Sequence, residues 1–389
     1  MFQNTKQILP TLCYHFIKGV YFISSQCVVV PVFITLHLLL WPLKFLQPST
    51  YWAIDVHLFK AVMGVVSSWF YTDGVVIQES GDSLEKILDD EALLMCNHQS
   101  TADIGIIMQS LHPKGMAAGH MTWIMDHVFK LTHFGWICGQ HGDFFLKQPC
   151  KTESERQEQI KNFRTHLQEV YTKTQKKWMV LFPEGGFLSS RKPGSQRFAK
   201  KNGWPVFENV ALPRLGIAQT IMDELTQQKA DSNMNENPGQ LKWIIDMTIA
   251  YPGGKAPNAL ALIFSTWKYP PIHVHYRVFD INKIPSDSTS FTKWMYERYG
   301  EKDTFLNEYY QTGTFMSKFP KTVHTDKRGA FAHFVFFVIC MYLSSSFVYS
   351  PVLSLIGVEV VALIIACYMV YFVYNFVQYF IHSWPSSNE

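Results

Sequence analysis

A long apolar stretch lies near the start of the chain. From Gly19 to Leu43 it contains no acidic residue, lysine or arginine, and Lys18 and Lys44 bracket it. At about 1.5 Å per helical residue, such a stretch crosses the ~30 Å hydrocarbon core of a bilayer. It is too long for a signal peptide and lacks a small-residue cleavage pattern. We therefore predict a membrane anchor over residues 1–47, with a re-entrant or in-plane helix as the alternative.

Two further stretches without charged residues follow each other closely, over residues 330–350 and 360–382. A turn containing Pro351 and Gly357 separates them. Together they predict a transmembrane hairpin and tail over residues 329–389. Lysines and an arginine just before the hairpin favour the cytosolic side by the positive-inside rule. The pattern thus predicts a multi-pass membrane protein whose main domain faces the cytosol.

Between these ends the apolar runs are shorter. The run from Tyr51 to Phe70 is interrupted by Asp55, His57 and Lys60, which predicts an amphipathic helix over residues 48–74 lying on the membrane or against the core. A main domain is predicted over residues 75–328, with a flexible polar insertion over residues 226–240. The expected strands are Val75–Ile77, Ala92–Cys96, His141–Lys147, Trp178–Phe182, Val210–Arg214, Trp243–Tyr251 and His273–Phe279, and the expected helices include Glu153–Lys177 and Ser288–Tyr310.

Composition supports membrane association and excludes some other classes. Hydrophobic residues make up 48% of the chain and charged residues 17%, a low charged fraction for a soluble protein. A net charge of +3 is too small to indicate nucleic-acid binding. The seven cysteines form no C-x-x-C pair, so we predict neither a disulfide framework nor a zinc site. His273 and His275 share one face of a strand, but no third ligand accompanies them, and no metal or cofactor is predicted.

The strongest chemical signal is a polar segment directly after a short buried strand. It contains His98 and Asp103, five positions apart. If a helix begins near Ser100 or Thr101, the two side chains fall on neighbouring turns. A carboxylate beside an imidazole fixes its tautomer and stabilises the imidazolium, giving a general base without a metal or covalent nucleophile. The alternative is that His98 caps a turn and Asp103 caps the helix.

Three more polar clusters follow strand-like runs. Lys147 ends the first, Glu184, Gly185 and Gly186 follow the second, and Arg214 ends the third. Cations there would suit a phosphate, and glycines let a ligand approach the backbone. From composition alone, Lys147 is a solvated strand end.

The order and spacing of these clusters resemble the glycerolipid acyltransferase family, which carries an HxxxxD box and an FPEG box. The resemblance covers roughly Val75 to Val278. The segments HGDFF, VLFPEGGFL and WIIDMTIAYP, together with the paired C-terminal spans, are similar to the lysophosphatidylglycerol acyltransferase branch. Two positions depart from the wider family: the strand-end cation is Lys147 where Arg is usual, and Gly186 stands where Ser or Thr is common.

The resemblance implies an α/β fold with a mixed sheet flanked by helices, and a location in the endoplasmic reticulum. It implies acyl-CoA as donor, with no bound cofactor, and a lysophospholipid as acceptor, such as lysophosphatidylglycerol or lysophosphatidylethanolamine. His98 then acts as general base and Asp103 orients it. Backbone N–H groups at the start of the following helix or around Gly185 hold the oxyanion, and Glu184 binds an acceptor hydroxyl or orders the loop. Lys147 and Arg214 bind the phosphodiester.

Other classes stay open at this point. A CoA-independent transacylase and a glycerol-3-phosphate or lysophosphatidate acyltransferase share the same boxes. A lipid-binding or transfer protein would need the boxes only for structure. Asp126 and His127 suggest a metal-dependent phosphohydrolase, although they lack further ligands. Neither the acceptor head group, the acyl length, the sn position, nor the oligomeric state follows from the residues.

Overall fold

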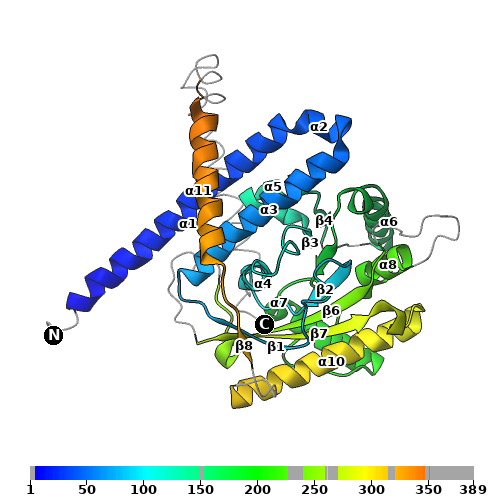
Figure 1. Cartoon of the computed structure of the whole chain (residues 1–389). Coiled ribbons are helices and arrows are strands. Elements are labelled where there is room, and N and C mark those ends of the chain that lie inside the picture. Colours follow the sequence, from blue (N-terminus) through cyan, green and yellow to red (C-terminus); the bar gives the residue numbers. More distant parts are fainter. Residues whose placement is uncertain are drawn as a thin grey trace.

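One mixed sheet of eight strands organises the structure, a computed structural model that describes residues 5–346 and 350 except 149, 151, 227–239, 259–260, 262–269 and 314–319. The strand order is β4-β3-β5-β2-β6-β7-β1-β8 (Figure 1). The run from β4 to β6 is parallel, and β7 joins β6 antiparallel, which confirms the predicted mixed α/β sheet. The strands are β1 (Ile77–Gly81), β2 (Ala92–Cys96), β3 (Met121–Asp126), β4 (Phe144–Leu146), β5 (Trp178–Leu181), β6 (Trp243–Ala250), β7 (Ile272–Asp280) and β8 (Lys321–Thr322).

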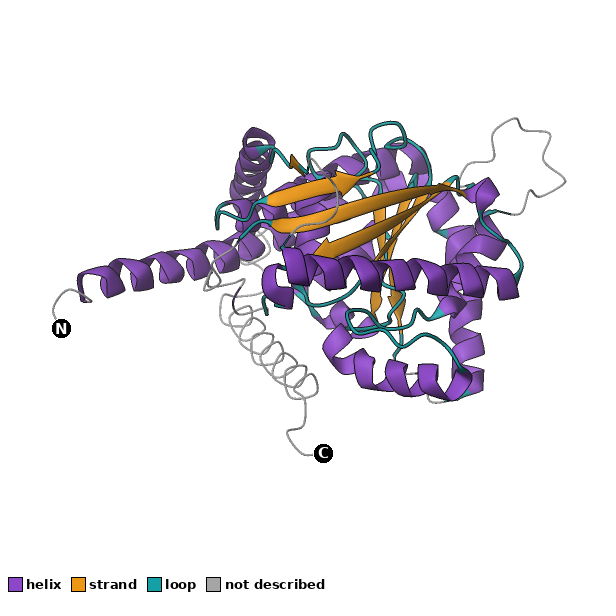
Figure 2. Cartoon of the chain, turned by 90° about the horizontal axis from the view of Figure 1, so that it is seen from below, coloured by secondary structure: helices purple, strands orange, loops and turns teal. Residues whose placement is uncertain are grey.

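Helices cover both faces of this sheet (Figure 2). They are α1 (Thr5–Leu39), α2 (Trp41–Leu46), α3 (Pro48–Tyr71), α4 (Ala102–Leu111), α5 (His133–His141), α6 (Glu153–Glu169), α7 (Leu188–Asn202), α8 (Leu215–Leu225), α10 (Ser288–Thr312) and α11 (Lys327–Ser344), with short 3-10 turns η1 (His127–Leu131), η2 (Tyr171–Lys173), η3 (Pro252–Gly254) and η4 (Ile281–Lys283).

The central strand β2 shows how the sequence builds two cores. All five of its residues are buried. Because side chains alternate along a strand, Leu94 and Cys96 pack into the core that contains α3 and α4, whereas Leu93 and Met95 pack into the core that contains α6, α8 and α10. Because β2 lies inside the sheet, between β5 and β6, the loop that follows it lies in the middle of the edge of the sheet.

Three described helices are long and apolar enough to cross a membrane by length and composition: α1, α3 and α11. In Figure 1, α1 projects beyond the sheet domain, α3 returns beside it, and α11 stands next to both. The helix α11 begins the predicted C-terminal hairpin. The second predicted span of that hairpin and most of the predicted insertion at residues 226–240 lie outside the described residues.

The helix α3 differs from the predicted amphipathic helix. It is buried around most of its circumference, and Asp55, which suggested a solvent-facing side, is 1% exposed. Its carboxylate pairs with His37 of α1, His141 of α5 and Lys176. The predicted polar face is therefore wrong at this position, because partners distant in the sequence compensate the charge inside the protein.

Some predicted strands also differ from the structure. The first strand begins at Ile77 and not at Val75, and the strand expected from His141 is only Phe144–Leu146 because α5 extends to His141. The run Val210–Arg214 forms no strand. Its N–H groups donate to the turn after β5 and to α7 instead: Ala211 to Glu184, Arg214 to the Pro183 carbonyl at 2.7 Å, and Leu212 to Ser195 Oγ of α7. This extended run thereby comes to lie against the Pro-Glu-Gly-Gly turn.

Candidate active site

His98 and Asp103 form a buried pair at the carboxyl end of β2. His98 Nδ1 lies 2.9 Å from Asp103 Oδ2, and the Asp103 side chain is 1% exposed. Asp103 sits in the first turn of α4, where a carboxylate also benefits from the helix dipole. Its Oδ2 accepts the backbone N–H groups of Gln99 and Ser100 at 2.6 and 2.9 Å. These bonds fix the carboxylate, and the imidazole Nε2 on the far side of the ring is left to face a reactant.

Three residues that the sequence reasoning missed complete the pair. The Tyr251 hydroxyl donates to Asp103 Oδ1 at 2.6 Å, and burial, followed by the nearby Asp103, raises the Tyr251 pKa and keeps this hydroxyl a donor. The His98 ring stacks on Phe182 with centroids 4.0 Å apart and contacts Phe187 at 4.5 Å. Tyr251 directly follows strand β6, so it carries the same strand-end signal as the predicted clusters.

Glu184 ties three loops together beneath the pair. Its side chain is buried, Oε1 accepts the His98 N–H, and Oε2 accepts the Ala211 N–H, both at 2.9 Å. Both oxygens are thus engaged with backbone groups. Of the two roles predicted for Glu184, the geometry supports ordering of the loop and not contact with an acceptor hydroxyl.

The burial of Glu184 makes stability depend on pH. Burial raises its pKa from 4.5 to about 8, against the opposing effect of the two N–H donors. Between these values the folded protein holds a proton that the unfolded chain has released, so the free energy of unfolding falls as pH rises. We expect the melting temperature of the wild type to fall over this window and that of Glu184→Gln, which cannot titrate, to fall less. Equal slopes for the two proteins would contradict the assignment.

Two arginines lie against the turn formed by Gly185 and Gly186. A Cβ on Gly185 would lie 3.3 Å from Arg214 Nε, and a Cβ on Gly186 would lie 2.6 Å from Arg191 Nε. Gly185 has φ +70°, a conformation that also favours glycine. Arg191 NH2 donates to the Gly185 carbonyl and to Gln148 Oε1. The two glycines therefore let both guanidinium groups reach the backbone of the turn.

The arginine pair is electrostatically suited to an anion. Burial, and then the proximity of Arg214, lowers the pKa of Arg191, while Asp126 opposes this effect. The Nε atom of Arg191 is buried and finds no hydrogen-bond partner among the described residues. An anion between the guanidinium groups would offset their repulsion and accept from them in the bidentate manner typical of arginine.

Lys147, the cation predicted for this role, is placed differently. It follows β4 with an exposed side chain, and its backbone N–H donates to Gln159 Oε1 at 2.9 Å. The structure brings its neighbour Gln148 to the Gly185 turn instead. Arg214 lies against Gly185, although it directly precedes α8 and does not end a strand as predicted. Arg191 was missed because it lies on α7 outside the FPEG box.

Some of the N–H groups in the regions predicted to hold the oxyanion are already engaged. The N–H groups of Gln99 and Ser100 bind Asp103, and the Gly185 N–H donates to the Phe182 carbonyl at 3.0 Å. Gly186 and Phe187 follow with N–H groups for which no acceptor lies among the described residues.

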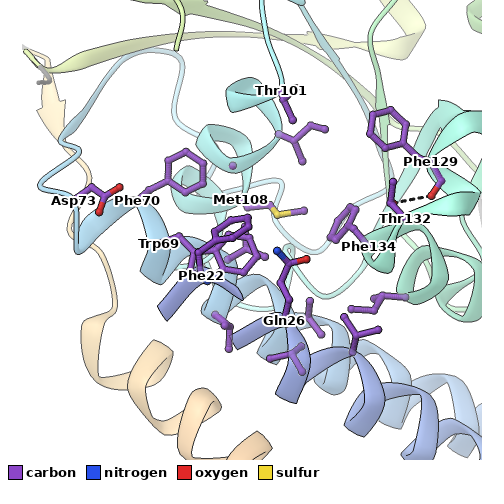
Figure 3. A pocket seen from close by; sticks show the side chains of 18 residues that line it. Phe22, Gln26, Trp69, Phe70, Asp73, Thr101, Met108, Phe129, Thr132 and Phe134 are labelled. Atoms are coloured by element: carbon purple, nitrogen blue, oxygen red, sulfur yellow. Dashed lines mark hydrogen bonds between the residues drawn. The ribbon is translucent and has the colours of Figure 1, made fainter. Parts of the chain in front are cut away.

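A largely apolar cavity of about 250 Å³ begins beside the pair (Figure 3). Thr101 and Gly105, from the segment that carries His98 and Asp103, line it. The other walls come from α1, α3 and the segment from η1 to α5, including Val29, Val65 and Phe134. Such a cavity accommodates a hydrocarbon chain, and its lining residue Thr101 is two positions from Asp103.

The metal-site alternatives receive no support from the described residues. Within them, no group of three or more His, Cys, Asp and Glu side chains is placed to hold a metal ion. Asp126 and His127 contact each other at 3.0 Å but have side chains 36% and 43% exposed.

Comparison with known proteins places this site in a family. Residues 77–213 match the family model described as Acyltransferase, and residues 263–339 match the model described as Acyltransferase C-terminus. The first match spans His98, Asp103, the Gly185 turn and Arg191, and it ends one residue before Arg214. The chain belongs to the acyltransferase family, and it is an acyltransferase.

Individual relatives sharpen this placement. The human protein named Acyl-CoA:lysophosphatidylglycerol acyltransferase 1 is 37% identical over 303 residues, which cover 76% of this chain and 81% of the human protein. The mouse protein named 1-acyl-sn-glycerol-3-phosphate acyltransferase epsilon is 28% identical over 310 residues, covering 74% and 79%. A crystal structure of the LPA acyltransferase PlsC from Thermotoga maritima has a TM-score of 0.42 and 13% identity, and covers 75% of this chain and 95% of that chain.

Proposed function

We propose that this protein transfers a fatty acyl group from acyl-CoA to a free hydroxyl of a lysophospholipid. The observation that carries the proposal is the His98–Asp103 pair, on a segment whose residues Thr101 and Gly105 line an apolar cavity. The name of the human relative favours lysophosphatidylglycerol as acceptor, and lysophosphatidylethanolamine belongs to the same proposed class.

The reaction follows from these groups. His98 Nε2 takes the proton of the acceptor hydroxyl, whose oxygen attacks the thioester carbonyl. Asp103 stabilises the imidazolium, and the N–H groups of Gly186 and Phe187 stand nearest to stabilise the oxyanion. The tetrahedral intermediate collapses with cleavage of the C–S bond. The sulfur leaves as CoA, taking the proton from His98.

The apolar cavity is the proposed acyl site. Narrowing it with Val65→Phe should lower the rate with long acyl-CoA relative to short acyl-CoA, because overpacking excludes the end of the chain first. Val32→Phe on α1, buried but outside the cavity lining, is the matched control. The ratio of long-chain to short-chain rates should change only for Val65→Phe, and an unchanged ratio there would contradict the assignment.

The arginine pair is the proposed phosphate site. Removing one charge-assisted bond costs about 1.5–3 kcal/mol, so Arg191→Gln or Arg214→Gln should raise the KM for the lysophospholipid by roughly 10- to 150-fold. Lys147→Gln, which removes an exposed cation, should raise it much less. Equal effects of all three substitutions would mean that the arginines act only through general charge.

The membrane assignment completes the proposal. Membrane association follows from α1 and α11 together with the family. We propose that the protein resides in the endoplasmic reticulum with its sheet domain on the cytosolic side, supported by the basic residues that precede α11.

A CoA-independent transacylase is the second candidate, since the base and cavity would serve a diacyl donor equally. The experiment is to follow free thiol after adding acyl-CoA with and without lysophospholipid. We expect one thiol released for each new ester, and only when the acceptor is present. Ester formation without thiol release, sustained by a diacylphospholipid, would favour the transacylase.

A further inference from the structure

The cavity lined by Thr101 and Gly105 has partly exposed residues along its wall. Lys18 pairs with Asp73 and Trp69 donates to Ser25, and these two contacts join α1 to the end of α3. Other lining residues keep partial exposure: Phe22 and Gln26 on α1, and Phe129, Thr132 and Phe134 on the segment from η1 to α5. Because these residues are partly exposed, the cavity opens to the outside between α1 and the η1–α5 segment. In Figure 3, Gln26 of α1 and Phe134 of that segment point into the same cavity.

Large apolar side chains stand next to this opening on both sides. On α1, Val20 and Ile23 are 49% and 56% exposed. On the η1–α5 segment, Val128, Leu131 and Trp136 are each more than a third exposed. Each of these residues is a near neighbour in sequence of a residue that lines the cavity, so the exposed apolar surface continues into the cavity wall.

The η1–α5 segment is built as a compact unit. The Thr132 hydroxyl donates to the Phe129 carbonyl at 2.8 Å and accepts from the Gly135 N–H at 3.0 Å. A Cβ on Gly135 would lie only 1.7 Å from the Phe129 carbonyl oxygen, so glycine is required for the two turns to close on each other. Its apolar side chains are therefore presented outward by a fixed backbone and not by a loose loop.

Continuity with α1 identifies what this surface contacts. The helix α1 is apolar over a membrane-spanning length. Exposed residues that lie beside α1 are therefore expected to contact the same lipid as α1. Lys130, exposed between Val128 and Leu131, places a cation where anionic lipid head groups would lie. An apolar surface with one flanking cation is typical of segments that insert into the bilayer interface.

We propose that Val128, Leu131 and Trp136 insert into the lipid surface beside α1. The gap between α1 and the η1–α5 segment is then a lateral entrance through which single-chain lipid reaches His98 from the bilayer. This inference rests on the proposed function for the identity of the lipid. It assigns the contact with the membrane surface to the η1–α5 segment, whereas the sequence predicted that the helix over residues 48–74 lies on the membrane or against the core.

The first test is photolabelling of the full chain in phosphatidylcholine vesicles containing phosphatidylglycerol and a phospholipid with a diazirine at the end of its acyl chain. We expect carbene insertion within residues 128–136 and none within residues 204–207. Val206, 39% exposed, is the control because its neighbour Phe207 belongs to the core on the opposite face of the sheet. Labelling of both peptides alike, or of neither, would overturn the surface assignment.

The second test separates delivery from chemistry. Leu131→Asp should raise the KM for long-chain lysophospholipid in vesicles roughly tenfold or more, as expected for one leucine side chain removed from apolar surroundings. Its kcat, and its KM for a short-chain lysophospholipid dissolved as monomers, should stay unchanged. Val206→Asp should change neither. An equal effect of Leu131→Asp on both acceptors would contradict a lateral entrance. If the wild type acylated neither acceptor, the proposed function would fail, while photolabelling would still decide the surface.

Discussion

His98→Ala is expected to lower acyl transfer by about 10²- to 10⁴-fold, the usual contribution of a general base. The loss should appear in kcat, because the His98 side chain supports the transfer of a proton and its backbone makes the contact to Glu184. The amount of protein in the membrane should not change. Rates measured with labelled acyl-CoA in membranes of matched protein content check this result.

A second contact between a histidine and an aspartate provides the control for His98→Ala. His127 contacts Asp126 at the same kind of distance as His98 contacts Asp103, yet its side chain is 43% exposed. His127→Ala should therefore leave the rate within a small factor of wild type. Wild-type activity in His98→Ala, or an equal loss in both variants, would show that the buried pair is not the base.

The second large effect is expected on stability, from Asp55→Asn in α3. Asp55 lies at the centre of a buried cluster with His37, His141 and Lys176, each at most 2% exposed. Removing one partner of a buried ion pair costs about 3–5 kcal/mol, a large part of the ~5–15 kcal/mol by which proteins are typically stable. We expect a strongly lowered melting temperature of the detergent-solubilised protein, or loss of folded protein altogether.

An exposed ion pair provides the comparison. Arg156 and Glu153 contact each other on α6 with side chains 61% and 62% exposed, and such pairs contribute about 0–1 kcal/mol. Arg156→Gln should barely change the melting temperature. If Asp55→Asn behaved like Arg156→Gln, α3 would be held by its apolar contacts alone, and the buried cluster would be dispensable.

Sequence reasoning reached the catalytic pair because the pair is local. His98 and Asp103 are five positions apart at a strand-to-helix junction, so strand burial and helix geometry together bring them into contact. Gly185 was found for the same reason, since its turn directly follows β5. The mixed sheet came from the family resemblance, and strand pairing then confirmed it.

What the sequence missed depends on contacts between distant segments. Asp55 looked like a solvent-facing residue because His141 and Lys176, more than eighty positions away, cannot be read from the helix pattern. Arg191 was missed and Lys147 was preferred because the FPEG box and the strand-end pattern do not show which residue of α7 faces the Gly185 turn. Gln99 and Ser100 stand where oxyanion donors were expected, and the folded loop uses their N–H groups to hold Asp103, a contact that the motif does not report.

Acyl transfer from labelled stearoyl-CoA to a panel of lysophospholipids, in membranes holding the wild type or His98→Ala, decides whether the protein is an acyl-CoA-dependent lysophospholipid acyltransferase with His98 as its base. We predict labelled diacylphospholipid with the wild type only, strongest for one head group, with lysophosphatidylglycerol and lysophosphatidylethanolamine first in the panel. Absence of transfer to every acceptor by the wild type, from stearoyl-CoA and from a diacyl donor alike, would contradict the account and leave a lipid-binding protein that keeps the fold.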